Sequence, residues 1–186
     1  MNSRTKPTWS DVKARLQEFD RTGLLMLIQD LYAASKDNQA FLHARYGLGE
    51  DVLKPYKQTI DRWLWPDMFK GQNTSVAKAK KAIADYKKAV GLPVGVAELT
   101  VYFCEQGSGF AKDVGLQDEA YFVALVRMFE QALLATVALP GVQRAPFLER
   151  LMAIRDLGHD LGYGVEDEMG NLFAEHASHC GLSASS

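Results

Sequence analysis

Cysteine is nearly missing from this chain of 186 residues, which contains only Cys104 and Cys180. Two thiols cannot build the disulfide framework of a small secreted domain, nor a zinc site with four cysteine ligands. Of the residues, 47% are hydrophobic and 24% are charged, which excludes a disordered tail and a collagen-like fibre. The composition is that of an ordinary soluble globular protein with reduced cysteines.

Long apolar runs are missing as well. The longest nearly apolar stretch, residues 132–142, is far shorter than the roughly 20 residues that a membrane-spanning helix requires. The first ten residues carry Arg4 and Lys6 but lack the apolar core of a secretory signal. These absences predict a cytoplasmic protein with no membrane partner.

The sequence also lacks familiar catalytic motifs. The run Gly107-Ser108-Gly109 has neither the third glycine of a dinucleotide loop nor the Gly-Lys-Ser/Thr of a phosphate loop, and we interpret it as part of a long turn. No Gly-x-Ser-x-Gly elbow occurs, and Cys104, expected to face the core, has no evident base beside it. We therefore predict no catalytic residue and no cofactor, which favours a non-enzymatic role.

Apolar residues recur at helical spacing along most of the chain. The spacing predicts about nine helices, over residues 9–19, 23–34, 37–46, 51–65, 74–90, 94–104, 117–139, 146–159 and 165–176. Residues 94–104 include strand-favouring side chains, but we expect a helix because no second segment offers a strand partner. The helix at residues 23–34 is apolar nearly all round, which predicts that it lies at the centre of the fold.

These elements predict an all-α protein with one domain over residues 1–186. Helices of this length with short connections are expected to pack as antiparallel hairpins, in an array like those of helical-repeat proteins. No sequence repeat of fixed period accompanies that pattern. The loop at residues 67–73 is a candidate soft joint within the domain.

Three segments carry a resemblance to a known family. They are AKKAIADYKK at residues 79–88, NQAFLHARY at residues 38–46 and LGYGVEDE at residues 161–168. Over roughly residues 10–176 the chain resembles a bacterial family of uncharacterised all-helical proteins, a domain of unknown function. The resemblance implies a helical fold and a bacterial cytoplasmic protein, and it brings no catalytic residues with it.

Charge is unevenly distributed along the chain. Up to Gly91 there are 16 basic and 10 acidic residues, and after it there are 5 and 13, which makes the two halves opposite in sign. Lys78, Lys81 and Lys88 lie along one side of the predicted helix at residues 75–90. Such a row can bind an acidic protein surface or track nucleic-acid phosphates. It can equally be a solvated face, or a face docked on the acidic half of the chain.

Two tryptophans, Trp63 and Trp65, lie beside the mid-chain loop. Large aromatic residues are typical anchors of protein interfaces, so both are candidate partner-binding residues. The alternative is that they form core between two parts of the domain.

The C-terminal region gathers imidazole and carboxylate side chains. His159, Glu168 and His176 are candidate metal ligands, and a bound metal could make a water molecule nucleophilic. Helix capping and a solvated tail explain the same residues without chemistry.

The sequence shows charged and aromatic residues suited to binding a partner, but it shows no arrangement of residues typical of a catalytic site. We therefore expect a helical interaction or scaffold protein whose partner is another protein. A metal-assisted enzyme using the C-terminal cluster and a nucleic-acid binder using the lysine helix remain the alternatives. The sequence leaves the oligomeric state open.

Overall fold

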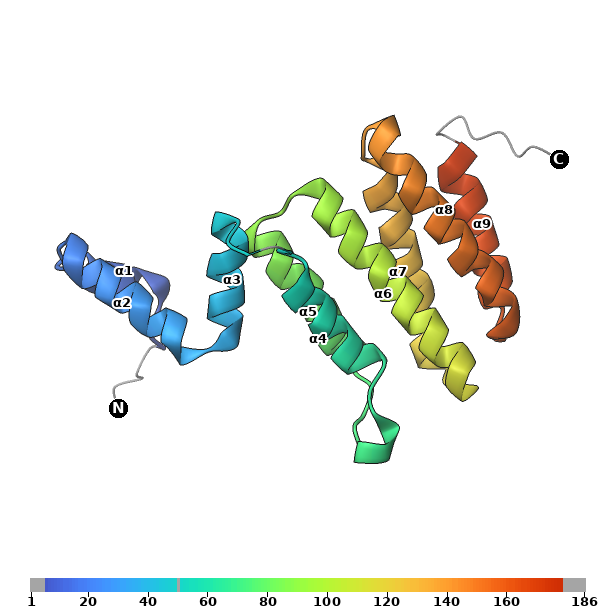
Figure 1. Ribbon diagram of the computed structural model, residues 1–186, viewed down its shortest axis with the longest axis horizontal. Coiled ribbons are helices and arrows are strands. Elements are labelled where there is room, and N and C mark those ends of the chain that lie inside the picture. Colours follow the sequence, from blue (N-terminus) through green and yellow to red (C-terminus); the bar gives the residue numbers. More distant parts are fainter. Residues whose placement is uncertain (1–5, 50, 179–186) are drawn as a thin grey trace.

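The computed structural model describes residues 6–49 and 51–178, which form nine α-helices, two short 3-10 helices and no strand (Figure 1). The α-helices are α1 (Trp9–Leu16), α2 (Arg21–Ala34), α3 (Lys36–Tyr46), α4 (Lys54–Leu64), α5 (Val76–Ala89), α6 (Pro93–Val114), α7 (Glu119–Val137), α8 (Gly141–Leu157) and α9 (Val165–Ser178). The 3-10 helices are η1 (Met68–Lys70) and η2 (Gly158–Asp160). The all-α prediction is confirmed, and the segment with strand-favouring side chains is helical.

Local capping chemistry sets many of the helix ends. The side chains of Ser35, Ser75 and Asp118 accept hydrogen bonds from backbone N–H groups in the first turns of α3, α5 and α7. Gly47 ends α3 in the left-handed conformation that a residue without Cβ adopts without strain. These signals lie within a few residues of each terminus, so the predicted starts of these three helices lie within two residues of the observed ones.

The prediction of a turn at Gly107-Ser108-Gly109 is wrong, because α6 continues through it to Val114. A Cβ at Gly107 would lie 3.0 Å from Leu125 Cδ1, and one at Gly109 would lie 2.7 Å from Trp65 Cζ3. Both glycines therefore permit close packing of side chains on α6 rather than a change of chain direction. The turn comes later, at Gly115.

From α4 onwards, α4 packs mainly against α5 and α6 mainly against α7, while α9 packs mainly against α7, and α8 packs against α6, α7 and α9 (Figure 1). Helix α6 lies at the centre, since it packs against α4, α5, α7 and α8. The largest fully buried side chains come from these helices and include Ile60, Leu64, Leu99, Phe103, Phe122, Phe129 and Leu151. Apart from Ala44 on α3, the buried core is thus built by residues from Tyr56 onward.

The prediction that the second helix is central is wrong. Helix α2 has no buried residue, and Leu25, Ile28 and Leu31 are about half exposed. Together α1 and α2 project from the rest of the molecule, and α2 packs mainly against α3 (Figure 1). An apolar helix sequence indicates that its surface is suited to burial against another element. Whether another helix of the same chain packs on that surface depends on the tertiary structure.

Helix α7 has the length and composition that crossing a membrane requires. Half of its apolar window is buried inside the protein, as in the core helix of a soluble protein. Its buried face includes Phe122, Phe129 and Leu133, and this burial accounts for its hydrophobicity. The loop at residues 67–73 contains η1 and closes the α4–α5 pair at one end.

Candidate functional site

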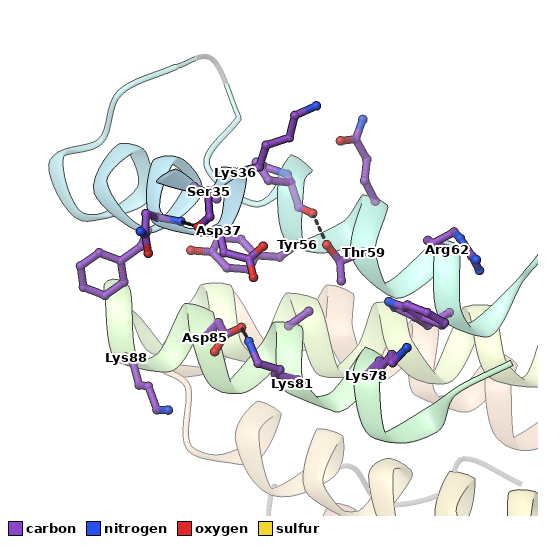
Figure 2. A pocket seen from close by; sticks show the side chains of 17 residues that line it. Ser35, Lys36, Asp37, Tyr56, Thr59, Arg62, Lys78, Lys81, Asp85 and Lys88 are labelled. Carbon is purple, nitrogen blue, oxygen red and sulfur yellow. Dashed lines mark hydrogen bonds and ion pairs between the residues drawn. The ribbon is translucent and has the colours of Figure 1, made fainter. Parts of the chain in front are cut away.

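A groove of about 890 Å³ opens between α3, α4 and α5 (Figure 2). We call it the α3–α5 groove. Its lining comprises Ser35, Lys36, Asp37, Asn38, Ala40 and Phe41 from the α3 region, Pro55, Tyr56, Gln58, Thr59, Arg62 and Trp63 from α4, and Lys78, Lys81, Ala82, Asp85 and Lys88 from α5. All three predicted partner-binding lysines and Trp63 therefore line one groove.

The helix periodicity of α5 explains this arrangement. Its core stripe, Ala79, Ala82, Ile83, Tyr86 and Ala89, is buried and holds the helix against its neighbours. Side chains three and seven positions apart share one side of a helix, so the lysines project together beside that stripe. Burial of the stripe thus orients the cationic row toward the groove.

Trp63 lies between two cations at one end of the α3–α5 groove. The Nζ atom of Lys78 is 3.8 Å from the centre of the indole ring, and Cζ of Arg62 is 4.5 Å from it. Both distances are within the range of cation–π attraction, which keeps the two charged groups close to the indole ring. The tryptophan therefore positions two cations at the groove as well as offering an apolar surface.

Positive charge dominates the lining. Five cations, Lys36, Arg62, Lys78, Lys81 and Lys88, face two anions, Asp37 and Asp85. Within the described part of the chain, Lys81 is the one member of the five in an ion pair, with its Nζ 2.5 Å from Asp85 Oδ2 (Figure 2). The hydrogen bond to Asp85 raises the pKa of Lys81 and keeps it charged. The groove consequently favours an acidic ligand.

The Tyr56 hydroxyl is the second distinctive feature of the groove. Tyr56 is 5% exposed, and its Oη has no hydrogen-bond partner among the described residues. Burial, together with the charge of Asp85, raises the pKa of this phenol, so it stays protonated and can donate. Its ring packs edge-on against Tyr86 with centroids 5.4 Å apart, which fixes its orientation. Buried polar groups are nearly always paired, so this donor suits an acceptor supplied by a ligand.

The structure separates the two tryptophans. Trp65 lies outside the groove lining and packs edge-on against Phe110, with centroids 6.2 Å apart, while remaining 43% exposed. Lys36 and Arg62 also line the groove, although neither was predicted from the sequence as a binding residue. The adjacency of Arg62 to Trp63 was a usable signal, whereas the approach of α3 to α5 depends on tertiary packing.

The C-terminal candidates are dispersed rather than gathered. His159 Nδ1 lies 2.9 Å from Glu166 Oε2, and that hydrogen bond raises the pKa of the imidazole. Glu168 is exposed in the first turn of α9, and His176 is in its last turn. Over residues 6–49 and 51–178, no group of three or more His, Cys, Asp or Glu side chains is placed to hold a metal ion. His179 and Cys180 lie outside the described residues.

Cys104 lies in the core, as expected from the sequence, and is fully buried. Burial raises the pKa of its thiol far above the ordinary value, so the reactive thiolate is suppressed. This environment is unsuited to a nucleophile.

Comparisons with protein-family models, curated proteins and solved structures find no match to this chain. The resemblance to a bacterial helical family therefore stays a prediction.

Proposed function

We propose that this protein is a non-enzymatic interaction module that binds an acidic segment of another protein in the α3–α5 groove. The observation that carries the proposal is the excess of cations along a lining that also contains apolar side chains, together with a Tyr56 hydroxyl that has no partner among the described residues. Carboxylates of a partner would accept hydrogen bonds from the lysines and from this hydroxyl. Trp63 supplies the apolar surface that anchors such contacts.

The two aspartates favour a peptide over a nucleic acid. A peptide offers backbone N–H groups, which can donate hydrogen bonds to the carboxylates of Asp37 and Asp85. A phosphate backbone presents acceptors and negative charge, which these carboxylates repel. The mixed lining therefore fits a chain that carries both donors and acidic side chains.

The experiment measures fluorescence anisotropy with a fluorescein-labelled peptide of alternating Glu and Ala residues. A peptide of alternating Gln and Ala residues serves as the uncharged control, and single-stranded oligo(dT) serves as a competing polyanion. The acidic peptide is expected to bind, with an affinity that falls as salt concentration rises, while the Gln peptide binds at least tenfold more weakly. Preferential binding of oligo(dT) would instead assign the groove to nucleic acid.

Charge reversal on α5 provides matched variants. Lys78→Glu changes a groove residue, whereas Lys87→Glu makes the same change on the same helix outside the groove lining. We expect Lys78→Glu to weaken peptide binding by roughly tenfold or more and Lys87→Glu by less than about threefold. Equal losses in the two variants, or no binding of the peptide by the native protein, would contradict the proposal.

A further inference from the structure

The segment formed by α1 and α2, residues 9–34, which we call the N-terminal arm, lacks a core of its own. Neither helix contains a buried residue. They have 8 and 14 residues, and helices below about 12–15 residues are marginal in water without tertiary packing. The arm is tied to α3 at one end, where Tyr32 Oη lies 2.9 Å from His43 Nε2 and Asn38 donates to the Leu31 carbonyl.

Apolar side chains on the arm are exposed in a pattern suited to helix packing. Leu24, Ile28 and Leu31 lie at positions i, i+4 and i+7 and are 37%, 46% and 51% exposed. This spacing places them on one face of α2, as in the seam between paired helices. Further exposed apolar residues of the arm are Trp9, Val12, Phe19, Leu25 and Met26. The arm therefore presents an uncovered apolar surface of the kind that marks an interface.

The exposed area of the whole chain is larger than a compact monomer requires. Its accessible surface is 12276 Å² for a mass of 20.7 kDa, whereas a compact protein of that mass exposes about 8,900 Å². Counting all fourteen residues outside the described ranges as fully exposed accounts for about 2,200 Å² of the excess. About 1,200 Å² remains, and a standard interface buries about 800 Å² on each partner.

We propose that the N-terminal arm is a dimerisation element that packs against the same arm of a second copy of this chain. Two arms together supply four helices, which is enough to enclose the core of a helical bundle. A two-fold interface requires a surface that complements itself, and the arm carries three basic and four acidic residues in positions 9–34, so like charges do not oppose pairing. The same balance disfavours an anionic membrane, which selects helices with basic polar faces.

Sedimentation velocity over a range of concentrations tests the proposal on the full chain. The native protein is expected to sediment as a dimer at about 10 µM. Ile28→Glu is expected to weaken association at least tenfold, since it places a charge at the centre of the seam. Val123→Glu is the matched control because Val123 is also β-branched, helical and 43% exposed, but lies on α7. It should leave the dimer intact.

Two further measurements distinguish dimerisation through the N-terminal arm from unfolding of a variant and from lipid binding. Ile28→Ala removes apolar surface without adding charge or lowering helix propensity, so it should weaken the dimer while circular dichroism shows the body of the protein still folded. Co-sedimentation with phosphatidylcholine vesicles tests whether the apolar surface of the N-terminal arm binds a lipid surface instead of a second copy of the chain. A native protein that stays monomeric at about 100 µM, dimers that resist both Ile28 variants, or a monomer that binds vesicles would each overturn the proposal.

Discussion

The guanidinium of Arg150 on α8 forms a bidentate ion pair with Glu105 on α6. Its Nε lies 2.6 Å from Oε1 of Glu105, and its Nη2 lies 2.7 Å from Oε2. The Nη1 atom of Arg150 also donates to Glu98, which accepts from Lys57 of α4 as well. These side chains are 18–31% exposed, so the network is partly shielded from solvent and links α4, α6 and α8. Burial alone would raise the pKa of Glu98, but the hydrogen bonds from Arg150 and Lys57 outweigh it and lower that pKa.

We expect Arg150→Gln to lower the free energy of unfolding by about 1–3 kcal/mol, because it leaves the half-buried carboxylate of Glu105 without its cation and leaves Glu98 with Lys57 alone. Urea unfolding followed by circular dichroism measures the change. Arg15→Gln is the control, since its ion pair with Glu18 is 81% and 70% exposed and should contribute less than about 0.5 kcal/mol. Equal effects of the two substitutions would show that the network adds no more than a surface pair.

The stability contributed by the hydrogen bond between His159 and Glu166 is expected to depend on pH. Their hydrogen bond raises the pKa of His159 above its ordinary value of 6.5. A raised histidine pKa contributes stability that is fully present below 6.5 and is lost as the pH rises through the folded-state value. NMR titration should show the raised value in the native protein and a lower one in Glu166→Gln, while Glu168→Gln leaves it nearly unchanged. An unshifted His159 in the native protein would contradict this pairing.

A close approach between α6 and α5 makes Gly95 sensitive to substitution. A Cβ at Gly95 would lie 2.0 Å from the hydroxyl oxygen of Tyr86, whose ring is buried and packs against Tyr56. We expect Gly95→Ala to lower the free energy of unfolding by about 1–3 kcal/mol through overpacking. Gly170→Ala in α9 meets no atom within 4 Å and should raise stability by about 0.5–1 kcal/mol, because alanine is the better helix former. Thermal unfolding of the two variants separates these opposite signs.

Tyr56→Phe distinguishes a ligand-binding hydroxyl from a structural one. Because this hydroxyl has no hydrogen-bond partner among the described residues, its removal should change the free energy of unfolding by less than about 0.5 kcal/mol. The same substitution should weaken binding of the acidic peptide by several-fold, since one donor to the ligand is lost. Urea unfolding and anisotropy on the same preparation measure both quantities. A large loss of stability with unchanged binding would assign the hydroxyl to the fold.

Local sequence patterns predicted much of the secondary structure. The helix α5 could be predicted from helix periodicity alone, because its buried side chains recur at helical spacing. The glycines at positions 107 and 109 were wrongly predicted to form a turn, because close packing against Leu125 and Trp65 also requires residues without a side chain. The lysine row was visible in the sequence, but its partners Trp63 and Tyr56 come from α4, and their proximity depends on how α4 meets α5.

The sequence by itself determined that this chain is helical, where most helices begin and end, and which side of α5 carries positive charge. These properties follow from periodicity, caps and breakers that act within a few residues. The tertiary structure alone decided that α6 is central, that α2 is uncovered and that the lysines meet Tyr56 in one groove. Burial depends on which surfaces meet across long sequence separations, and two equally apolar helices can therefore end at the centre and at the edge of the same protein.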